Sequence, residues 1–209
     1  MNVAAISNLY RNEGAGAMLR YAAERALCRV YETNDAFWFE RNLSEPIAAV
    51  RPEIELDIDM DAGLKTILWI KSSGERWMLS ENELRTAGAA RHYFPSVMHK
   101  GTVIGYAKVA TQRVYIDDYR REISLPERAA FIYDTYVCPP FRGRKIARRL
   151  ISEIMLRLRG DGFAALGCHI PPWNTSSINA YTGAGFKCVR YARYRRLAGI
   201  SWIEERKFQ

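Results

Sequence analysis

The sequence predicts an α+β domain at residues 53–209, preceded by an N-terminal extension at residues 1–52. Three observations lead to this prediction. Runs of alternating or β-branched residues indicate strands, runs with apolar residues three and four apart indicate helices, and both kinds alternate along the second half of the chain. A chain of 209 residues buries about 70% of its unfolded surface on folding, so this domain needs no disulfide bonds.

The N-terminal extension contains a predicted helix at residues 14–30, whose apolar side chains gather near one face. This helix either packs on the core or lies on a membrane surface or a partner protein. Residues 36–43 fit a short strand or an aromatic anchor, and Pro46 and Pro52 bracket a linker. Residues 53–60 alternate apolar and acidic side chains, as a half-buried strand does, and the domain is expected to begin there.

The middle of the chain contains two predicted helices and a predicted hairpin. Residues 62–72 fit a strand or a helix, whereas residues 81–91 fit a second helix. Residues 99–101 form a turn before a strand at residues 102–110. The polar residues 115–128 are expected outside the core, where they either carry recognition or form a solvated hairpin extension.

A buried strand is predicted at residues 131–137 because β-branched and aromatic residues dominate it. The Pro139-Pro140 pair ends this strand, since proline cannot donate to a ladder. A basic turn at residues 142–145 then leads into a helix with an apolar face at residues 146–158. Free N–H groups and the positive end of the helix dipole at this turn suit a pyrophosphate.

The next elements are a strand at residues 163–170 and a short helix that begins near Asn174. With about 3.6 residues per helical turn, Asn174, Ser177 and Tyr181 line up along one side of this helix. An asparagine, a helix start and a phenol on one face suit the handling of a thioester and a leaving thiolate. Asn174 alone would be an ordinary helix cap.

Two motifs in this order resemble the GNAT superfamily of acyl-CoA-dependent N-acyltransferases. The first is V-x-P-x-F-R-G at residues 137–143, and the second is N-x-x-S-x-x-x-Y-x-x-x-G-F at residues 174–186. The resemblance extends from residue 101 to residue 202. It implies a single domain with a mixed central sheet flanked by helices, and it favours a helix at residues 62–72. It also implies an N-acetyltransferase that uses acetyl-CoA.

The resemblance implies specific roles for the motif residues. The backbone around Val137 and Cys138 would pair with the pantetheine arm and the acyl carbonyl. Asn174 would contact the cofactor, and Tyr181 would protonate the departing thiolate. The amides that would bind the coenzyme A diphosphate are those of Arg142, Gly143, Arg144, Lys145, Ile146 and Ala147.

One residue of the turn departs from the family pattern. Lys145 stands where the family has a glycine, whereas Ala147 fits the last position of the motif. Glycine lets the backbone approach phosphates without a Cβ atom in the way. Lysine keeps the N–H group and adds a cation, so Lys145 either compensates for the lost glycine or weakens the affinity for the cofactor.

Acyl transfer to an amine requires a neutral amine, a stabilised oxyanion and a protonated thiolate. Tyr181 can supply the last proton, unless it is a core tyrosine. Asp134 lies in an apolar strand and needs a partner there, so it either accepts the proton of the amine or holds a neighbouring turn. Cys138 permits a route through an acyl-cysteine, but direct transfer is simpler because no histidine is adjacent in sequence.

The formal net charge of +8 favours anionic partners. Coenzyme A is one such partner, and the expected acceptor is a primary amine of a small molecule or a cell-envelope precursor. The alternatives are a longer-chain acyltransferase that uses an acidic acyl carrier protein, and a non-catalytic module that binds coenzyme A. Residues 190–196 interleave arginine with tyrosine, but without a nucleic-acid-binding module they are predicted to form an amphipathic strand, and no nucleic-acid partner is expected.

The remaining composition predicts a cytoplasmic protein. The four cysteines lack C-x-x-C spacing and the three histidines are dispersed, so no metal site is expected. No apolar run approaches the ~18 residues of a membrane span, although peripheral membrane contact stays open. The N-terminus lacks the features of a signal peptide. A monomer or a homodimer is expected.

Overall fold

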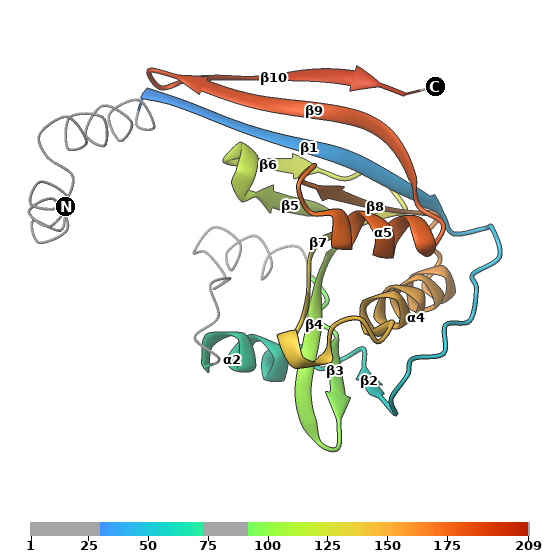
Figure 1. The fold of residues 1–209 in the computed structure, drawn as a ribbon. Coiled ribbons are helices and arrows are strands. Elements are labelled where there is room, and N and C mark those ends of the chain that lie inside the picture. The colour runs from blue at the N-terminus through green and yellow to red at the C-terminus, as the bar shows by residue number, and fades with distance from the viewer. Residues whose placement is uncertain (1–29, 73–91, 209) are drawn as a thin grey trace, which may run out of the picture.

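The computed structural model describes residues 30–72 and 92–208. Eight strands form one mixed sheet in the order β10-β9-β1-β8-β7-β4-β3-β2, and β5 and β6 form a separate hairpin (Figure 1). Among the described strands, β7 and β8 pair in parallel and the other neighbours are antiparallel. The strands are β1 (Tyr31–Asn42), β2 (Asp57–Asp59), β3 (Ser96–His99), β4 (Thr102–Ala110), β5 (Arg113–Ile116), β6 (Arg121–Ser124), β7 (Ala129–Val137), β8 (Ala165–Ile170), β9 (Lys187–Leu197) and β10 (Ile200–Lys207).

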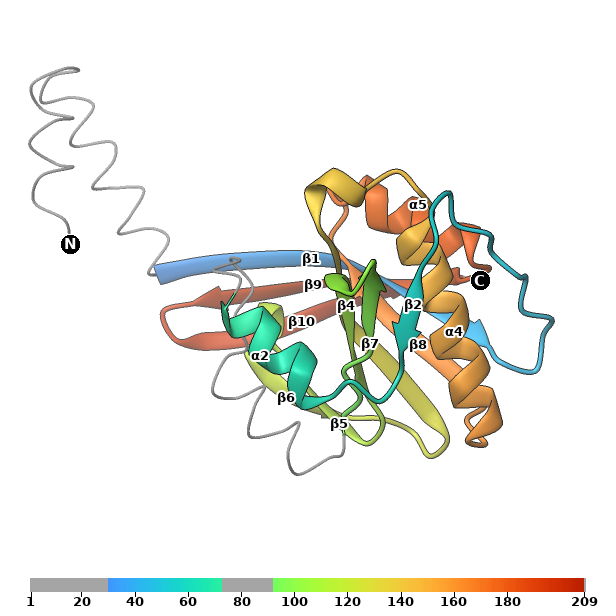
Figure 2. The ribbon, with the colours of Figure 1, turned by 90° about the horizontal axis from the view of Figure 1, so that it is seen from below.

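Helices lie on both faces of the sheet, which confirms the predicted α+β fold. The described helices are α2 (Leu64–Ser72), α4 (Ile146–Gly160) and α5 (Thr175–Gly183), with 3-10 turns η1 (Asp117–Tyr119) and η2 (Pro139–Phe141). Seen from below, α2 and α4 lie on opposite sides of the strands (Figure 2). The helix predicted at residues 62–72 is confirmed as α2, whereas those predicted at residues 14–30 and 81–91 lie outside the described residues.

The main core lies between the sheet and the helices α4 and α5. The apolar side of α4 is fully covered, with Leu150 and Ile151 at 0% exposure, because its apolar residues recur every three or four positions. Tyr181 of α5 and Phe39 of β1 belong to the same buried cluster. This packing fixes α4 and α5 against the ends of β7 and β8, the two strands that precede them in the chain.

The opposite face of the sheet is covered in two places. The hairpin β5–β6 covers one part, where Tyr119 packs with Trp38 and Phe131. The helix α2 covers another, where Ile70 packs with Tyr106 and Tyr136. The prediction that residues 115–128 lie outside the core was therefore wrong for Ile116 and Tyr119, because the hairpin and its 3-10 turn pack these two side chains against the sheet.

The strand β1 corrects the predicted domain boundary. It pairs with β8 through Phe37–Asn42 and with β9 through Tyr31–Glu40, so it is an inner strand of the sheet. A boundary at residue 52 would cut β1 out of the sheet whose ladders it completes. The strand predicted at residues 53–60 is shorter in the structure, where only the three residues of β2 pair with β3 at the sheet edge.

Candidate active site

The two parallel strands at the middle of the sheet separate along their length. Pairing between β7 and β8 begins at Ala129↔Ala165 and ends at Ile132↔Cys168. Tyr133 is the extra residue of a β-bulge there, since Val109 of β4 pairs with Ile132 and Lys108 pairs with Asp134. A bulge bends its strand and often lies next to an active site. The second half of β7 consequently no longer pairs with β8, and the region between their unpaired ends is called the opening between β7 and β8.

The backbone of β7 beyond the bulge presents polar groups to this opening. The N–H of Cys138 donates to the carbonyl of Ile104 at 2.8 Å, so Cys138 faces β4. Antiparallel partners alternate between bonded and non-bonded pairs, and the backbone groups of Thr135 and Val137 therefore point away from β4, towards β8. Of the two residues predicted to pair with a pantetheine arm, Val137 has an N–H that faces the opening, whereas the N–H of Cys138 is already bonded.

The helix α5 places a phenol in the opening. Asn174 caps this helix, because its Oδ1 accepts from the N–H of Ser177 at 3.1 Å. Tyr181 lies two turns further on, is 5% exposed and packs edge-to-face on Phe186 at 5.0 Å. Its hydroxyl lies 2.9 Å from Oγ1 of Thr135, across the gap between α5 and β7.

The environment of Tyr181 keeps its proton in place. Burial raises the pKa of the Tyr181 phenol well above its ordinary value, and the charges of Cys168 and, to a smaller extent, Asp134 raise it further. The hydrogen bond with Thr135 acts in the opposite direction. The phenol is therefore protonated at neutral pH, in the state that a proton donor requires.

The turn after β7 presents unused amides at the N-terminus of α4. In the described structure no backbone carbonyl accepts from the N–H groups of residues 143–148. Gly143 and Lys145 have φ values of 82° and 62°, and such left-handed residues turn successive N–H groups towards one side. A helix N-terminus with free amides fits a diphosphate, and no Cβ atom blocks the turn at Gly143, where nothing lies within 4 Å.

The conformation of Lys145 explains how a lysine replaces glycine in this turn. Left-handed backbone costs a non-glycine residue roughly 1–2 kcal/mol, but lysine can still adopt it. The backbone path is therefore that of a glycine-containing turn. The Lys145 ammonium is exposed and lies 3.9 Å from a carboxylate oxygen of Glu53.

The two arginines of the turn differ in their contacts. Nε of Arg142 donates to the carbonyl of Val137 at 2.9 Å, and its guanidinium lies over the ring of Tyr136 at 5.6 Å. Arg142 thus fixes the end of β7. The side chain of Arg144 is exposed, and the Arg144 carbonyl accepts from the N–H of Glu53 at 3.3 Å.

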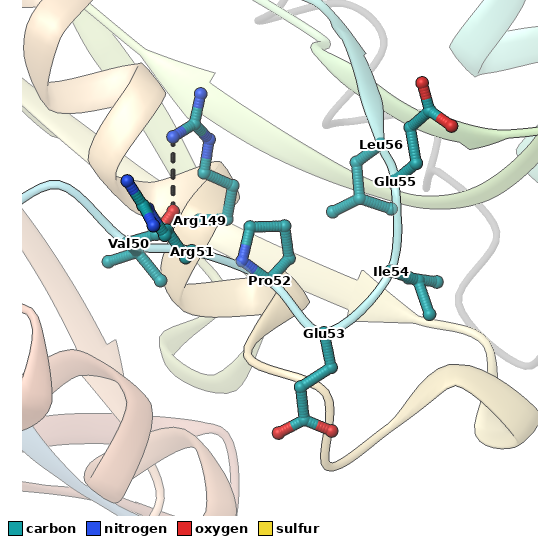
Figure 3. A pocket seen from close by; sticks show the side chains of 8 residues that line it. All are labelled: Val50, Arg51, Pro52, Glu53, Ile54, Glu55, Leu56 and Arg149. Atoms are coloured by element: carbon teal, nitrogen blue, oxygen red, sulfur yellow. Dashed lines mark hydrogen bonds between the residues drawn. The ribbon is translucent and has the colours of Figure 1, made fainter.

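The segment between β1 and β2 lies along α4 beside this turn. Arg149 donates to the carbonyl of Val50 at 3.2 Å. A hollow of about 490 Å³ lies between this segment and α4 (Figure 3). It is lined by Val50, Arg51, Pro52, Glu53, Ile54, Glu55, Leu56 and Arg149. This hollow adjoins the α4 N-terminus and is separate from the opening between β7 and β8.

The predicted base Asp134 lies on the face of the sheet opposite Tyr181. Its Oδ2 accepts from the Tyr106 hydroxyl at 3.0 Å and lies 3.3 Å from Nζ of Lys108, which is almost fully buried. Both contacts hold the carboxylate on the face of the sheet that α2 covers. Cys138 is half-buried and packs beside Tyr136, on the same face as Asp134.

Sequence reasoning missed three residues of this region. Thr135 and Lys108 are recognisable only from their contacts with Tyr181 and Asp134. His169 was not among the predicted site residues, because the three histidines are dispersed in the sequence. Its partner is Asp118, 51 residues away in the sequence, where no local pattern indicates a pair.

The comparisons with known proteins agree with this architecture. The model of the acetyltransferase (GNAT) family matches residues 62–186, which is more than half of the chain. The chain belongs to this family, and its fold is a single GNAT domain with a mixed sheet. A comparison with curated proteins gave no match.

Solved structures of low identity share the fold. A GCN5-related N-acetyltransferase from Sphaerobacter thermophilus has a TM-score of 0.59 and 17% identity, over 90% of this chain and 58% of that one. A protein assigned to the GNAT family from Novosphingobium aromaticivorans has a TM-score of 0.52 and 19% identity, over 81% of this chain and 66% of that one. This chain thus spans less than two thirds of either protein. No described helix is long and apolar enough to cross a bilayer.

Proposed function

We propose that this protein transfers an acetyl group from acetyl-CoA directly to a primary amine, with Tyr181 as the general acid. The expected acceptor is a small molecule or a cell-envelope precursor. The observation that carries the proposal is the placement of Tyr181 in the opening between β7 and β8, with unused amides at the nearby α4 N-terminus. Acetyl-CoA supplies the activated acyl group as a thioester.

The residues that would hold the cofactor follow from the described contacts. The free amides of residues 143–148 suit the diphosphate, and the exposed cations of Arg144 and Lys145 add attraction for it. The N–H of Val137 faces the opening and can donate to the thioester carbonyl as negative charge develops on it. Asn174 contributes by starting α5 at the right place, since its side chain caps that helix.

The departing thiolate needs a proton donor near its sulfur atom. The Tyr181 hydroxyl holds its proton at neutral pH and points into the opening, where Thr135 fixes its direction. It can therefore protonate the leaving thiolate as the carbon–sulfur bond breaks. Direct transfer is the simpler route, because in the described residues Cys138 packs against aromatic rings rather than facing Tyr181.

The retained geometry of the turn argues against a loss of cofactor binding. Lys145 adopts the backbone conformation for which glycine is preferred, so its substitution leaves the amides in position. A cytoplasmic location fits a donor that is a cytoplasmic metabolite, and the described cysteines 138, 168 and 188 are free thiols.

The experiment is calorimetry with acetyl-CoA, followed by a thiol-release assay on a panel of primary amines. We expect binding with one site per chain and turnover on at least one amine. The matched comparison is an acyl carrier protein thioester as donor, which distinguishes the two donor classes. A folded protein that does not bind acetyl-CoA would refute the proposal.

A further inference from the structure

His169 lies at the point where β7 and β8 separate. It directly follows Cys168, the last residue of β8 that pairs with β7, and its side chain is 9% exposed. Nε2 lies 3.2 Å from Oδ2 of Asp118, on the hairpin that covers this face of the sheet. Nδ1 is buried and has no hydrogen-bond partner. A buried polar atom without a partner costs about 1–3 kcal/mol and calls for an explanation.

The Asp118 carboxylate sets the tautomer of the ring. A carboxylate only accepts hydrogen bonds, so the proton of a neutral His169 resides on Nε2, and Nδ1 carries a lone pair. Nδ1 is then the ring atom that can accept a proton. His169 is therefore built as a proton acceptor.

We propose that His169 is the general base of the acetyl transfer and that Asp118 is its positioning residue. This role rests on the proposed function. The Nδ1 atom is covered in the described structure, so the ammonium group of the acceptor reaches it after a neighbouring side chain moves or through one water molecule.

The placement of His169 complements that of Tyr181. Tyr181 shares the buried cluster of Cys168 on the α4 and α5 side, whereas His169 is on the other face at the adjacent position of β8. Direct transfer needs such an arrangement, because the amine enters from one side of the thioester carbon and sulfur departs on another. The base and the acid would then act on the thioester from opposite faces of the sheet.

Protons and electrons balance when His169 acts as the base and Tyr181 as the acid. His169 Nδ1 removes one proton from the ammonium, and the freed nitrogen lone pair attacks the thioester carbon to form the carbon–nitrogen bond. The carbon–sulfur bond breaks, sulfur keeps the electron pair and takes the Tyr181 proton. The second nitrogen proton restores Tyr181, and His169 releases its proton to solvent.

The groups packed against His169 leave Asp118 as its main electrostatic partner. The ring stacks on Phe131 at 5.9 Å and 11° and also contacts Trp38 of β1. Tyr119 lies beside it and is neutral, because burial raises the pKa of its phenol to about 12. The guanidinium of Arg190 of β9 lies over the Trp38 ring, 4.2 Å from its centroid. By contrast, Asp134 is engaged with the buried Lys108 ammonium.

The first test is the pH dependence of kcat/KM for His169→Gln. We expect a loss of about 10²–10⁴-fold near neutral pH, with unchanged acetyl-CoA affinity by calorimetry. The loss should shrink at high pH, where the amine loses its proton without help. A purely structural defect would not follow pH in this way. His99→Gln is the matched control, because His99 lies on β3 and bonds the carbonyl of Glu55.

The second test does not depend on turnover. Nitrogen-15 NMR of the histidine rings, assigned with His169→Gln, should show the Nε2–H tautomer, and Asp118→Asn should disturb it. An Nδ1–H tautomer overturns the role of His169 even in an active enzyme. A wild-type pH profile in the His169→Gln variant also overturns this role. If Asp134→Asn loses that profile, the base is Asp134 instead. A wild-type protein that fails to bind acetyl-CoA refutes the proposed function and this role with it.

Discussion

The Tyr181 hydroxyl and Thr135 Oγ1 lie 2.9 Å apart, and this hydrogen bond joins α5 to β7 beyond the last β7–β8 pair. Because α5 follows β8 in the chain, this bond links β7 to the segment after β8, at a level where β7 and β8 no longer pair. The contact also fixes the direction of a phenol that burial keeps protonated. The Thr135 and Tyr181 side chains thus connect α5 and β7 where the backbone ladder between β7 and β8 has ended.

Tyr181→Phe should reduce turnover and leave acetyl-CoA binding nearly intact. Phenylalanine keeps the ring packed on Phe186 and removes only the hydroxyl. A general acid contributes about 10²–10⁴-fold, so the expected loss of kcat lies in that range if thiolate departure limits the rate. The measurement is steady-state kinetics with saturating acetyl-CoA on an amine that the wild type uses.

Two further variants separate catalysis from packing in that experiment. Tyr194→Phe removes the hydroxyl of another buried tyrosine, in the cluster under the β5–β6 hairpin, and should keep wild-type turnover. Thr135→Val should give a partial loss, because Tyr181 keeps its proton but loses its fixed direction. Wild-type kcat in Tyr181→Phe would make Tyr181 a packing residue.

Lys145→Gly should stabilise the fold by about 0.5–1 kcal/mol. The gain arises because glycine adopts the left-handed conformation freely, whereas lysine at φ 62° does not. Acetyl-CoA affinity should be preserved or improved, since the amides keep their positions. The pair with Glu53 is exposed on both sides, so its loss matters little. Urea unfolding and calorimetry measure the two effects.

Ala198→Gly is the matched control for that variant. Ala198 has a φ of 47° in the turn between β9 and β10, away from the diphosphate turn. It should gain similar stability and leave cofactor affinity unchanged. A weaker affinity in Lys145→Gly alone would show that the lysine cation, rather than the backbone path, matters for binding.

Gly105→Ala should destabilise the sheet beside the opening. A Cβ atom at this position of β4 would lie 2.6 Å from the carbonyl oxygen of Tyr136, on the paired strand β7. The contact involves backbone, so one strand has to shift, at a cost of about 1–3 kcal/mol. Gly160→Ala serves as the control, because nothing lies within 4 Å of a Cβ atom there. Equal unfolding free energies for both variants would contradict the close approach of β4 and β7.

The elements that carry the motifs were predictable because local patterns define them. The apolar spacing of α4 and the β-branched run of β7 lie within single segments, and the structure places both near the predicted bounds. The left-handed backbone of Lys145 was not predictable, since lysine rarely adopts it. Its motif position was evident, but the conformation that keeps the turn intact was not.

The long-range relationships were beyond the reach of sequence patterns. Residues 36–43 were predicted as a short strand or an aromatic anchor, and the choice of β8 and β9 as partners depends on the whole sheet. The bulge at Tyr133 and the pairing of His169 with Asp118 have no local signature either. Asp134 was predicted as a candidate base because it lies in an apolar strand. The buried Lys108 beside it was evident only from the structure.

Tyr119→Phe should make the protein less sensitive to alkali. Burial is the main reason that the pKa of the Tyr119 phenol rises from 10.0 to about 12. The folded state therefore holds more protons than the unfolded state between these values, so stability falls as the pH rises through this window. The fall attributable to Tyr119 is about 3 kcal/mol at most.

The measurement is urea unfolding of wild type and variant from pH 8 to pH 12. At pH 8 the variant should be less stable by about 1 kcal/mol, because Trp38 Nε1 loses the phenol oxygen that accepts its hydrogen bond at 3.1 Å. Above pH 10 the two curves should converge and then cross, since phenylalanine does not ionise. Tyr115→Phe, at a half-buried position of β5, is the matched control. Parallel curves for wild type and Tyr119→Phe would show that Tyr119 titrates alike in the folded and unfolded states.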